Sequence, residues 1–530
     1  MIVNIKYIDG CGNNSSKLYK ELNKLIGKNV HNSVFPEYIS QKKLALDFRD
    51  FFISKIQDII DSFDDISEIP TFSLIPDFPL SVMSSFTPVS QEKVEYLVTK
   101  LNRTNCKNDP IDVKLLDFEV VGNTLNGVFS DIINKSFESG VFPESEKFAY
   151  IRPLIKSNKD PDDLSSYRPL YNTSFLSKLL ERAALDQLKL HLSRFEFFSK
   201  FQSAYREFHS VETAICRIYN DLVICKSKGE CTLLILLDLS AAFDTVDHDI
   251  LLADLKLMRL DGKVLDWFES YLRDRRFKVV IGDEVSEEGN MVSGVPQGSI
   301  LGPILFIIYT TELQYLLQSH GVSCHFYADD TQIYFKITDR NHDEFKLNRL
   351  MTEIRTWMTN RKLKLNGDKT EMIIIGAQSK IDELDFFSRL RVDESQVTIA
   401  PKVKSLGIFI DKQLLMRDQL RNTKRKAIFN LVNISRISKY IDRSSIMKLV
   451  HCLVFSNIDF CNSIYYDLPN CDLRPLQMII NRAARITVGS ARFCRERITP
   501  ICIDLNLFPT KILIKNKICL LSHIADNYGQ

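Results

Sequence analysis

Two adjacent aspartates, Asp329 and Asp330, lie between two short runs that have the composition of β-strands. Residues 322–327 and 332–337 are rich in β-branched and aromatic side chains, which predicts a hairpin with both carboxylates at its tip. Neighbouring carboxylates repel one another unless a cation lies between them. Hard divalent ions such as Mg²⁺ prefer such oxygen ligands. Taken alone, however, an Asp–Asp pair is more often a simple polar turn.

A third carboxylate, Asp238, ends a continuous run of Leu and Ile at residues 232–238. Such a run predicts a strand that is buried on both faces, and a carboxylate at its end is costly unless it is neutralised. If this strand pairs beside the hairpin, three carboxylates come together and can hold two divalent ions, the arrangement that supports in-line phosphoryl transfer. The alternative for Asp238 alone is a capping role for the helix that follows nearby, expected at residues 247–257.

The overall charge excludes little, because 530 residues carry a net charge of only +2, with 45% hydrophobic and 26% charged residues. This is ordinary globular composition, and the length suits about three or four domains or one multi-lobed enzyme. The charge distribution is more informative. Residues 401–450 contain twelve Lys or Arg and three acidic residues. Such a basic block favours an anionic partner, although a solvated helix face would look the same.

The twelve cysteines occur singly and form no Cys-x-x-Cys pair, which argues against a zinc ribbon. Free thiols in a reducing compartment are the better interpretation. The first residues lack the apolar core of a signal peptide, and no apolar run approaches the ~20 residues that span a bilayer. The sequence therefore predicts an intracellular protein without a membrane span.

Hydrophobic periodicity divides the chain into parts with different secondary structure. Residues 1–65 are expected to be helical, because apolar residues from Leu44 onward recur at helix spacing. Residues 66–90 are rich in proline and serine and predict a linker. Residues 142–411 alternate strands and helices, and almost all of the chain from 414 onward is helical in pattern. The pattern predicts an α+β fold, a sheet with helices packed on one face. The further elements expected are strands at 278–281, 291–292 and 371–375, a strand or hairpin at 403–410, and helices at 302–317, 343–363, 413–437, 443–455 and 472–488.

Several short motifs surround the aspartates in a fixed order. They are Gly140-Val141-Phe142-Pro143, Arg152-Pro153-Leu154-Ile155-Lys156, Tyr167-Arg168-Pro169, Ser174-Phe175-Leu176-Ser177-Lys178, Gln202-Ser203-Ala204-Tyr205-Arg206, Ser293-Gly294-Val295-Pro296-Gln297-Gly298-Ser299, Tyr327-Ala328-Asp329-Asp330, Leu365-Asn366 and Leu406-Gly407. Each motif is weak by itself. In this order they resemble the reverse transcriptases of non-LTR retrotransposons, in particular the jockey-like superfamily of LINE elements. The resemblance runs nearly end to end and is clearest over residues 100–490.

The resemblance implies a right-hand polymerase, with fingers, a palm that holds an antiparallel sheet, a helical thumb, and helical extensions at both ends. Full-length elements of this type carry an endonuclease ahead of the polymerase, and we expect this chain to be truncated at both ends. The implied division is 1–65, a helical connector; 66–134, a linker and N-terminal extension of the fingers; 135–411, fingers and palm; 412–490, a basic helical thumb; and 491–530, a truncated C-terminal segment.

The catalytic centre is implied by the same resemblance. Asp238, Asp329 and Asp330 correspond to the three catalytic aspartates, which bind two Mg²⁺ ions, with Mn²⁺ as a possible substitute. The backbone carbonyl of Leu239 would complete the ligands of one ion. Lys369 corresponds to a lysine proposed to protonate the leaving pyrophosphate, although it could also be a solvated cation beside Glu371.

The nucleotide site is implied by five further residues. Lys156 and Arg168 match cations of the fingers that contact the incoming triphosphate, while two ordinary surface charges are the alternative. Gln297 and Gly298 match a loop that lies against nucleotide and template, where a close backbone approach favours glycine. Phe243 stands where RNA polymerases typically carry an aspartate that binds the ribose 2′-hydroxyl. An aromatic ring there fills the space of that hydroxyl and favours deoxynucleotides, and a plain core aromatic has the same geometry.

The basic block then becomes a candidate surface for nucleic acid, because phosphate contacts of this kind are independent of base sequence and sensitive to salt. The residues that we expect to contact nucleic acid are Arg206, Arg421, Lys424, Arg425 and Lys426. The implied partners are an RNA template, a DNA primer and dNTPs. Nuclear residence is expected from the life cycle of the family alone.

The sequence thus predicts an RNA-directed DNA polymerase of a LINE-like element. The main alternative is a decayed or domesticated relative that binds RNA without polymerising, and the presence of all three aspartates argues against it. An RNA polymerase is disfavoured by Phe243 and by the Tyr-Ala-Asp-Asp sequence.

Overall fold

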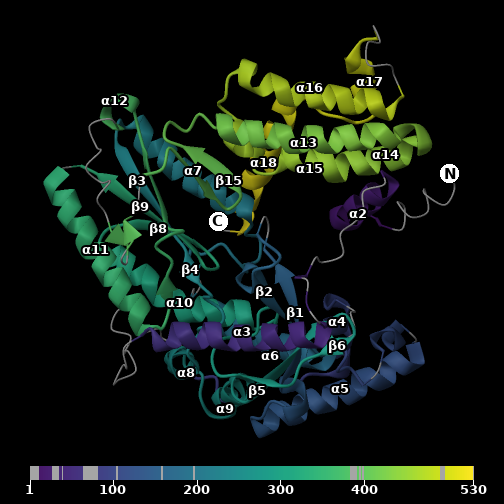
Figure 1. The fold of residues 1–530 in the computed structure, drawn as a ribbon, viewed down its shortest axis with the longest axis vertical. Coiled ribbons are helices and arrows are strands. Elements are labelled where there is room, and N and C mark those ends of the chain that lie inside the picture. The colour runs from purple at the N-terminus through teal and green to yellow at the C-terminus, as the bar shows by residue number, and fades with distance from the viewer. Residues whose placement is uncertain are drawn as a thin grey trace.

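The computed structural model contains two main β-sheets with helices around them, and a bundle of C-terminal helices that packs together at one end (Figure 1). It describes residues 11–528 with the exception of positions 13, 27–34, 37, 39, 64–80, 103–105, 111, 118, 157–158, 195–196, 198, 339, 382–390, 393–394, 397–398 and 490–495. In the described part of the chain, none of the helices combines the length and the apolar character that crossing a membrane requires.

One sheet, called here the β3 sheet, is antiparallel and has the order β11-β3-β9-β8. The inner strand β3 separates two hydrophobic cores, because successive side chains of a strand point to opposite faces. Leu233, Ile235 and Leu237 belong to one core, whereas Leu234 belongs to the other and Leu236 packs against it. The strands are β3 (Cys231–Leu237), β8 (Ser323–Tyr327), β9 (Asp330–Ile337) and β11 (Glu371–Ile375).

The other sheet, called here the β5 sheet, has the order β2-β1-β5-β6, with β7 also paired to β5. Helix α3 (Gln41–Asp61) packs on it: Phe48 and Phe52 share a core with Tyr167 and Val279. The rings of Phe48 and Tyr167 meet edge to face with centroids 4.9 Å apart. The strands are β1 (Phe148–Ile155), β2 (Tyr167–Thr173), β5 (Arg275–Ile281), β6 (Glu284–Val285) and β7 (Gly289–Met291).

Most helices between and around the sheets bury the larger of the two cores that β3 separates. The most apolar is α10 (Gly302–Ser319), which has Pro303 in its first turn, where its fixed φ suits a helix start. The other helices of this part are α4 (Gln91–Lys100), α5 (Glu119–Ser139), α6 (Phe175–Ser193), α8 (His248–Leu257), α9 (Gly262–Leu272), α11 (Arg340–Asn360) and α12 (Gln378–Ile381). Helix α7 (Val211–Ser227) instead buries Ile215, Ile218 and Leu222 in the core on the other face of the β3 sheet.

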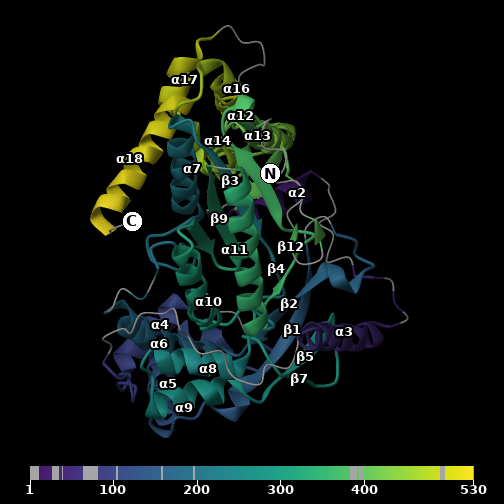
Figure 2. The same cartoon turned by 90° about the vertical axis from the view of Figure 1, so that its left-hand side faces the viewer.

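The C-terminal helices form the second core together with one face of the β3 sheet. Leu18 and Leu22 of α2 (Ser15–Leu25) join this core, and α18 runs beside α7 (Figure 2). The C-terminal helices are α13 (Arg417–Ile437), α14 (Arg443–Val450), α15 (Ser456–Asp459), α16 (Asn470–Thr487), α17 (Ile498–Asp504) and α18 (Thr510–Tyr528). The remaining short strands are β4 (Leu239–Ser240), β10 (Lys364–Leu365), β12 (Arg391–Val392), β13 (Ser395–Gln396), β14 (Lys402–Ser405) and β15 (Ile408–Asp411).

The mixed α and β class is confirmed, as are the buried strand β3 and the aspartate hairpin of β8 and β9. The expectation that helices cover one face of the sheet was wrong, because helices pack on both faces of the β3 sheet and bury a core on each. The expected N-terminal helical region differs in one respect. Its two helices pack on separate parts of the molecule, α2 on the C-terminal core and α3 on the β5 sheet. The expected linker at 66–90 falls largely outside the described residues, and the domain bounds stay predictions.

Candidate active site

Strand pairing brings the three aspartates to one edge of the β3 sheet. Leu237 pairs with Thr331, so the next residues outward on the two strands are Asp238 and Asp330. Asp330 also pairs with Tyr327 across a two-residue turn that contains Asp329. Ala328, the first residue of that turn, has a φ of +58°. Tight hairpins require a left-handed residue there because it matches the twist of the strands.

Burial and the nearby negative charges raise the pKa of two carboxyl groups at this edge, Asp329 and Asp330. Burial raises the pKa of Asp330 to about 6, and the charges of Asp329 and Asp238 add to the effect. Burial, together with Asp238, also raises the pKa of Asp329. A carboxylate that is crowded in this way is stabilised in its charged form by a cation. The Nζ atom of Lys369 lies 3.4 Å from an Asp238 carboxylate oxygen and supplies one such charge.

The donors of this edge suit a hard divalent ion, which binds carboxylate and carbonyl oxygens. They form an open arrangement: within the described ranges, no three His, Cys, Asp or Glu side chains converge closely enough to enclose a metal. An ion bound here would therefore depend on further ligands, such as the oxygens of a substrate or water. Open positions of this kind are typical of catalytic rather than structural metal sites.

A cavity of about 1100 Å³ joins the aspartates to most of the other predicted site residues. It lies between the edge of the β3 sheet and the end of the β5 sheet, since β2 and the loop after β1 form its opposite wall. Ten predicted residues line it: Lys156, Arg168, Asp238, Leu239, Phe243, Gln297, Gly298, Asp329, Asp330 and Lys369.

The wall opposite the carboxylates is positively charged. Lys156 follows β1, and its Nζ donates a hydrogen bond of 2.7 Å to the carbonyl of Ser165. Burial, together with the neighbouring cations Lys55, Lys369 and Arg168, lowers its pKa to about 8. Cations that crowd one another beside an open cavity are stabilised by an anion. The wall is therefore suited to a phosphate group.

A third group of residues shapes the floor of the cavity. The side-chain amide of Gln297 donates to both carboxylate oxygens of Asp244, at 2.9 and 2.8 Å. Gly298 has a φ of +107°, and a Cβ atom there would lie 3.0 Å from the carbonyl oxygen of Tyr171. Both the left-handed backbone and the close approach require glycine. The half-buried ring of Phe243 stacks on Phe306, with centroids 4.5 Å apart.

The predicted nucleic-acid-binding cations do not line this cavity. The guanidinium of Arg206 donates to the carbonyls of Ser199 and Gln202 and so holds its own loop. The α13 residues Arg421, Lys424, Arg425 and Lys426 are exposed on the C-terminal bundle. Their role stays a prediction, and they form a surface separate from the cavity lining.

Among the lining residues that the sequence analysis did not predict are Asp244 and Lys55. Asp244 directly follows Phe243, and only its burial distinguishes it from an ordinary turn residue. Lys55 belongs to α3, just over 100 positions before the first predicted site residue, Lys156. The one signal in the sequence was a lysine inside the apolar run Phe51-Phe52-Ile53-Ser54-Lys55-Ile56.

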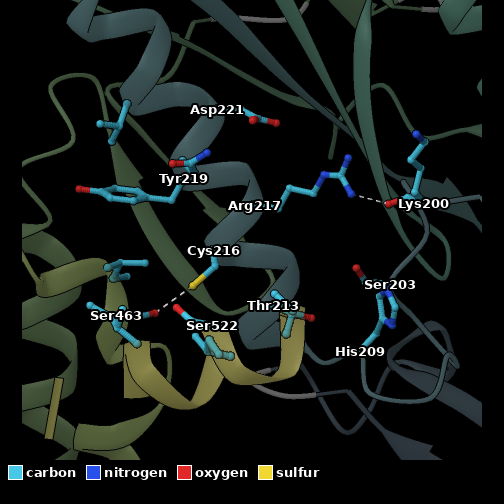
Figure 3. Close-up of a pocket in the computed structure, with 16 residues that line it drawn as sticks. Lys200, Ser203, His209, Thr213, Cys216, Arg217, Tyr219, Asp221, Ser463 and Ser522 are labelled. Carbon is cyan, nitrogen blue, oxygen red and sulfur yellow. Dashed lines mark hydrogen bonds between the residues drawn. The ribbon is translucent and has the colours of Figure 1, made fainter. Parts of the chain in front are cut away.

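A second cavity, of about 810 Å³, lies against α7 and α18 (Figure 3). Arg217 points across it and donates to the carbonyl of Lys200, and the Cys216 thiol lies 3.0 Å from the hydroxyl of Ser463. Its lining includes a single acidic residue, Asp221. It lacks the carboxylate pair that two-metal phosphoryl transfer needs.

Comparison with known proteins agrees with the geometry of the first cavity. Residues 156–410 match the family model described as "Reverse transcriptase (RNA-dependent DNA polymerase)". This range includes every residue of the cavity lining that the sequence analysis predicted.

Several similar curated proteins are named as polymerases of mobile elements. A probable RNA-directed DNA polymerase from transposon BS of Drosophila melanogaster is 26% identical over 390 residues, 71% of this chain and 42% of that protein. The RNA-directed DNA polymerase from mobile element jockey of Drosophila funebris is 24% identical over 431 residues, 79% and 46%. A probable polymerase from transposon X-element of Drosophila melanogaster is 23% identical over 476 residues, 88% and 50%. The chain thus spans half or less of the length of these relatives.

Proposed function

Because the chain carries a reverse transcriptase domain of the type found in non-LTR retrotransposons, we propose that it extends a DNA primer on an RNA template. The observation that carries the proposal is the cavity in which Asp238, Asp329 and Asp330 face the cations Lys156 and Arg168. Carboxylates on one wall suit the metal ions of phosphoryl transfer, and cations on the other suit the triphosphate. The second cavity, against α7 and α18, does not combine both charges in this way.

The polymerase architecture is part of the proposal. The β3 sheet is the palm, because it carries the aspartates at its edge. The β5 sheet with α3 belongs to the fingers, because it carries the triphosphate-facing cations. Helices α13–α16 form the thumb, and the exposed cations of α13 contact the phosphates of the template–primer duplex.

Each residue of the cavity has a proposed task. Asp238, Asp329 and Asp330, with the Leu239 carbonyl, would hold two Mg²⁺ ions, or Mn²⁺ in their place. Bound there, the ions would acidify the primer 3′-hydroxyl and neutralise charge on the transferring phosphate. Lys369, within reach of Asp238, can hold a proton for the leaving pyrophosphate.

The remaining residues position the nucleotide. Lys156 and Arg168 bind the triphosphate, and Gln297, fixed by Asp244, lies against the base pair. The ring of Phe243 occupies the space that a ribose 2′-hydroxyl would need. The ring of Phe306 stacks on the ring of Phe243 and restricts its movement away from the nucleotide. We propose that the Phe243 ring, held in this way, selects deoxynucleotides.

A primer-extension assay tests the proposal. The purified chain, supplied with an RNA template, an annealed DNA primer, Mg²⁺ and dNTPs, is expected to lengthen the primer. Asp329→Asn keeps the size of the side chain and removes a negative metal ligand, so incorporation should fall to background. Template binding should survive the substitution.

Two results would count against the proposal. A folded parent chain that binds template–primer without extending it would favour the non-polymerising relative. Extension that persists in Asp329→Asn would refute the assignment of the aspartates.

A further inference from the structure

Helix α3 brings a cation into the active-site cavity from far outside the matched reverse transcriptase domain. Lys55 lines the same cavity as Lys156, Arg168 and Asp330, although the domain match begins at residue 156. Figure 1 shows α3 crossing the lower half of the molecule beside the strands of the β5 sheet. The side chain of Lys55 is half-buried, so the ammonium group is neither a free surface charge nor part of the core.

Among the described residues, the Lys55 ammonium group has no direct ion-pair partner, and Asp244 acts on it only as a nearby charge. In the described residues it makes no hydrogen bond or ion pair. Burial lowers its pKa, the negative charge of Asp244 opposes this, and the cations Lys369 and Arg168 lower it further. Asp244 is already bonded through both oxygens to Gln297. An anion that enters the cavity would therefore bind the Lys55 ammonium group without first displacing a hydrogen bond or an ion pair of that group.

Several contacts fix α3 and so hold Lys55 in place. Near the start of the helix, the Lys42 ammonium donates to the carbonyl of Val285 at 2.7 Å. In the middle, Phe48 packs on Tyr167, the residue just before Arg168. Beyond its end, Lys364 of β10 lies 3.2 Å from the hydroxyl of Ser62. The helix thus spans both cavity walls, and a preorganised cation binds an anion with a smaller loss of entropy.

We propose that Lys55 is a third triphosphate-binding cation, which acts with Lys156 and Arg168 on the incoming nucleotide. This inference rests on the proposed function. The triphosphate is favoured over the template backbone because Lys55 is clustered with the two cations of the wall opposite the aspartates. It makes α3 a working part of the nucleotide site and not only a connector.

Amine footprinting tests the proposal without requiring catalysis. The intact chain is acetylated with and without dNTP or inorganic tripolyphosphate, and modification is read at each lysine by mass spectrometry. We expect at least fivefold slower acetylation of Lys55 when either triphosphate is present. Lys43, on the same helix but paired with Asp47 at 2.8 Å on the surface, should be unaffected and is the internal control.

Two footprinting outcomes would overturn the assignment. Protection of Lys55 by template–primer but not by either triphosphate would assign the lysine to the nucleic-acid backbone. No protection under any condition would remove it from phosphate binding altogether. Neither outcome depends on primer extension. Lys55 can therefore fail to be protected in a chain that extends primers, and it can be protected in a chain that does not.

Kinetics supply the second test. A hydrogen bond from a cation contributes enough that Lys55→Met should raise KM for dNTP by roughly tenfold. The affinity for template–primer should stay within about twofold, Lys55→Arg should recover most of the loss, and Lys43→Met should match the parent. An unchanged KM for dNTP in Lys55→Met would contradict the proposal even if triphosphate slowed the acetylation of Lys55.

Discussion

At the scale of single residues, the cavity depends on buried charges that neutralise one another only in part. Asp244 shows this most clearly, because it is buried, accepts two hydrogen bonds from one amide, and has Lys55 as a nearby cation. Its carboxylate fixes Gln297, which in turn fixes the loop at Gly298 through the backbone bond from Tyr171 to the Gln297 carbonyl. A group that would touch no substrate can therefore set the shape of the proposed nucleotide site.

The titration of Asp244 gives a prediction for stability. Burial raises its pKa to about 6, above the ordinary 3.8, so the folded chain binds this proton more tightly than the unfolded chain does. Its contribution to stability is complete below pH ~4 and is lost as the pH rises through 6. The Asp244→Asn variant has no carboxyl group to ionise at this position, so it does not show this fall in stability with rising pH. Urea unfolding should show the variant gaining about 3 kcal/mol relative to the parent between pH 4 and 7.

Asp442→Asn is the control for that experiment, because it should change in the opposite direction. Hydrogen bonds from Ser445 lower the pKa of Asp442, which caps α14. Its stabilising contribution is present at neutral pH and is lost on acidification, so this variant should lose stability relative to the parent as the pH rises. A difference between Asp244→Asn and parent that does not vary with pH would contradict the assignment of the raised pKa.

At the scale of elements, one buried ion pair joins three helices behind the β3 sheet. Arg361, just after α11, makes two parallel hydrogen bonds of 2.9 Å to Asp254 of α8, and both side chains are only 1% exposed. The same guanidinium donates to the carbonyl of Tyr309 of α10 and lies over its ring. Because burial raises the pKa of Asp254, the carboxylate depends on this arginine to stay charged.

Removing one partner of that pair should be costly. Arg361→Met leaves a buried carboxylate alone, and the expected loss is about 3–5 kcal/mol in the free energy of unfolding. Arg349→Met, on α11 itself, breaks a surface pair with Glu353, 2.9 Å long, and should cost less than about 1 kcal/mol. Urea unfolding of both variants makes the comparison. The double variant Arg361→Met, Asp254→Leu should regain much of the loss, and equal effects of the two single variants would disprove the role of the buried pair.

The elements that periodicity could predict are those whose burial pattern is local. The Leu and Ile run of β3 and the two runs of the aspartate hairpin each carry their own signal, and the pairing of Leu237 with Thr331 follows from burying them together. The place of α3 could not be predicted in this way. Its apolar stripe indicates that something covers it, but the partner, the β5 sheet, is formed by residues that begin about 90 positions later.

At the scale of the whole molecule, contacts between distant segments decide which residues meet. Lys517 of α18 is paired with Glu212 of α7, 305 positions away, at 2.9 Å, and α2 packs on the C-terminal core. The motifs led us to expect the aspartates, Lys156 and Arg168 in one site, and the structure places them around one cavity. No local pattern in the sequence indicates that α3 brings Lys55 to the same cavity.

The basic face of α13 belongs to this largest scale, because it lies outside the cavity and can act only on an extended partner. Lys424, Arg425 and Lys426 are exposed. If they bind the phosphates of an RNA–DNA duplex, changing all three to Ala should weaken binding regardless of base sequence. Each phosphate that is no longer neutralised should also reduce the slope of log affinity against log salt by roughly 0.9. Fluorescence anisotropy between 50 and 300 mM salt would measure a total decrease of about 2 to 3. Lys256→Ala, an exposed lysine of α8, should leave the slope unchanged, and an unchanged slope in the triple variant would place the duplex on another surface.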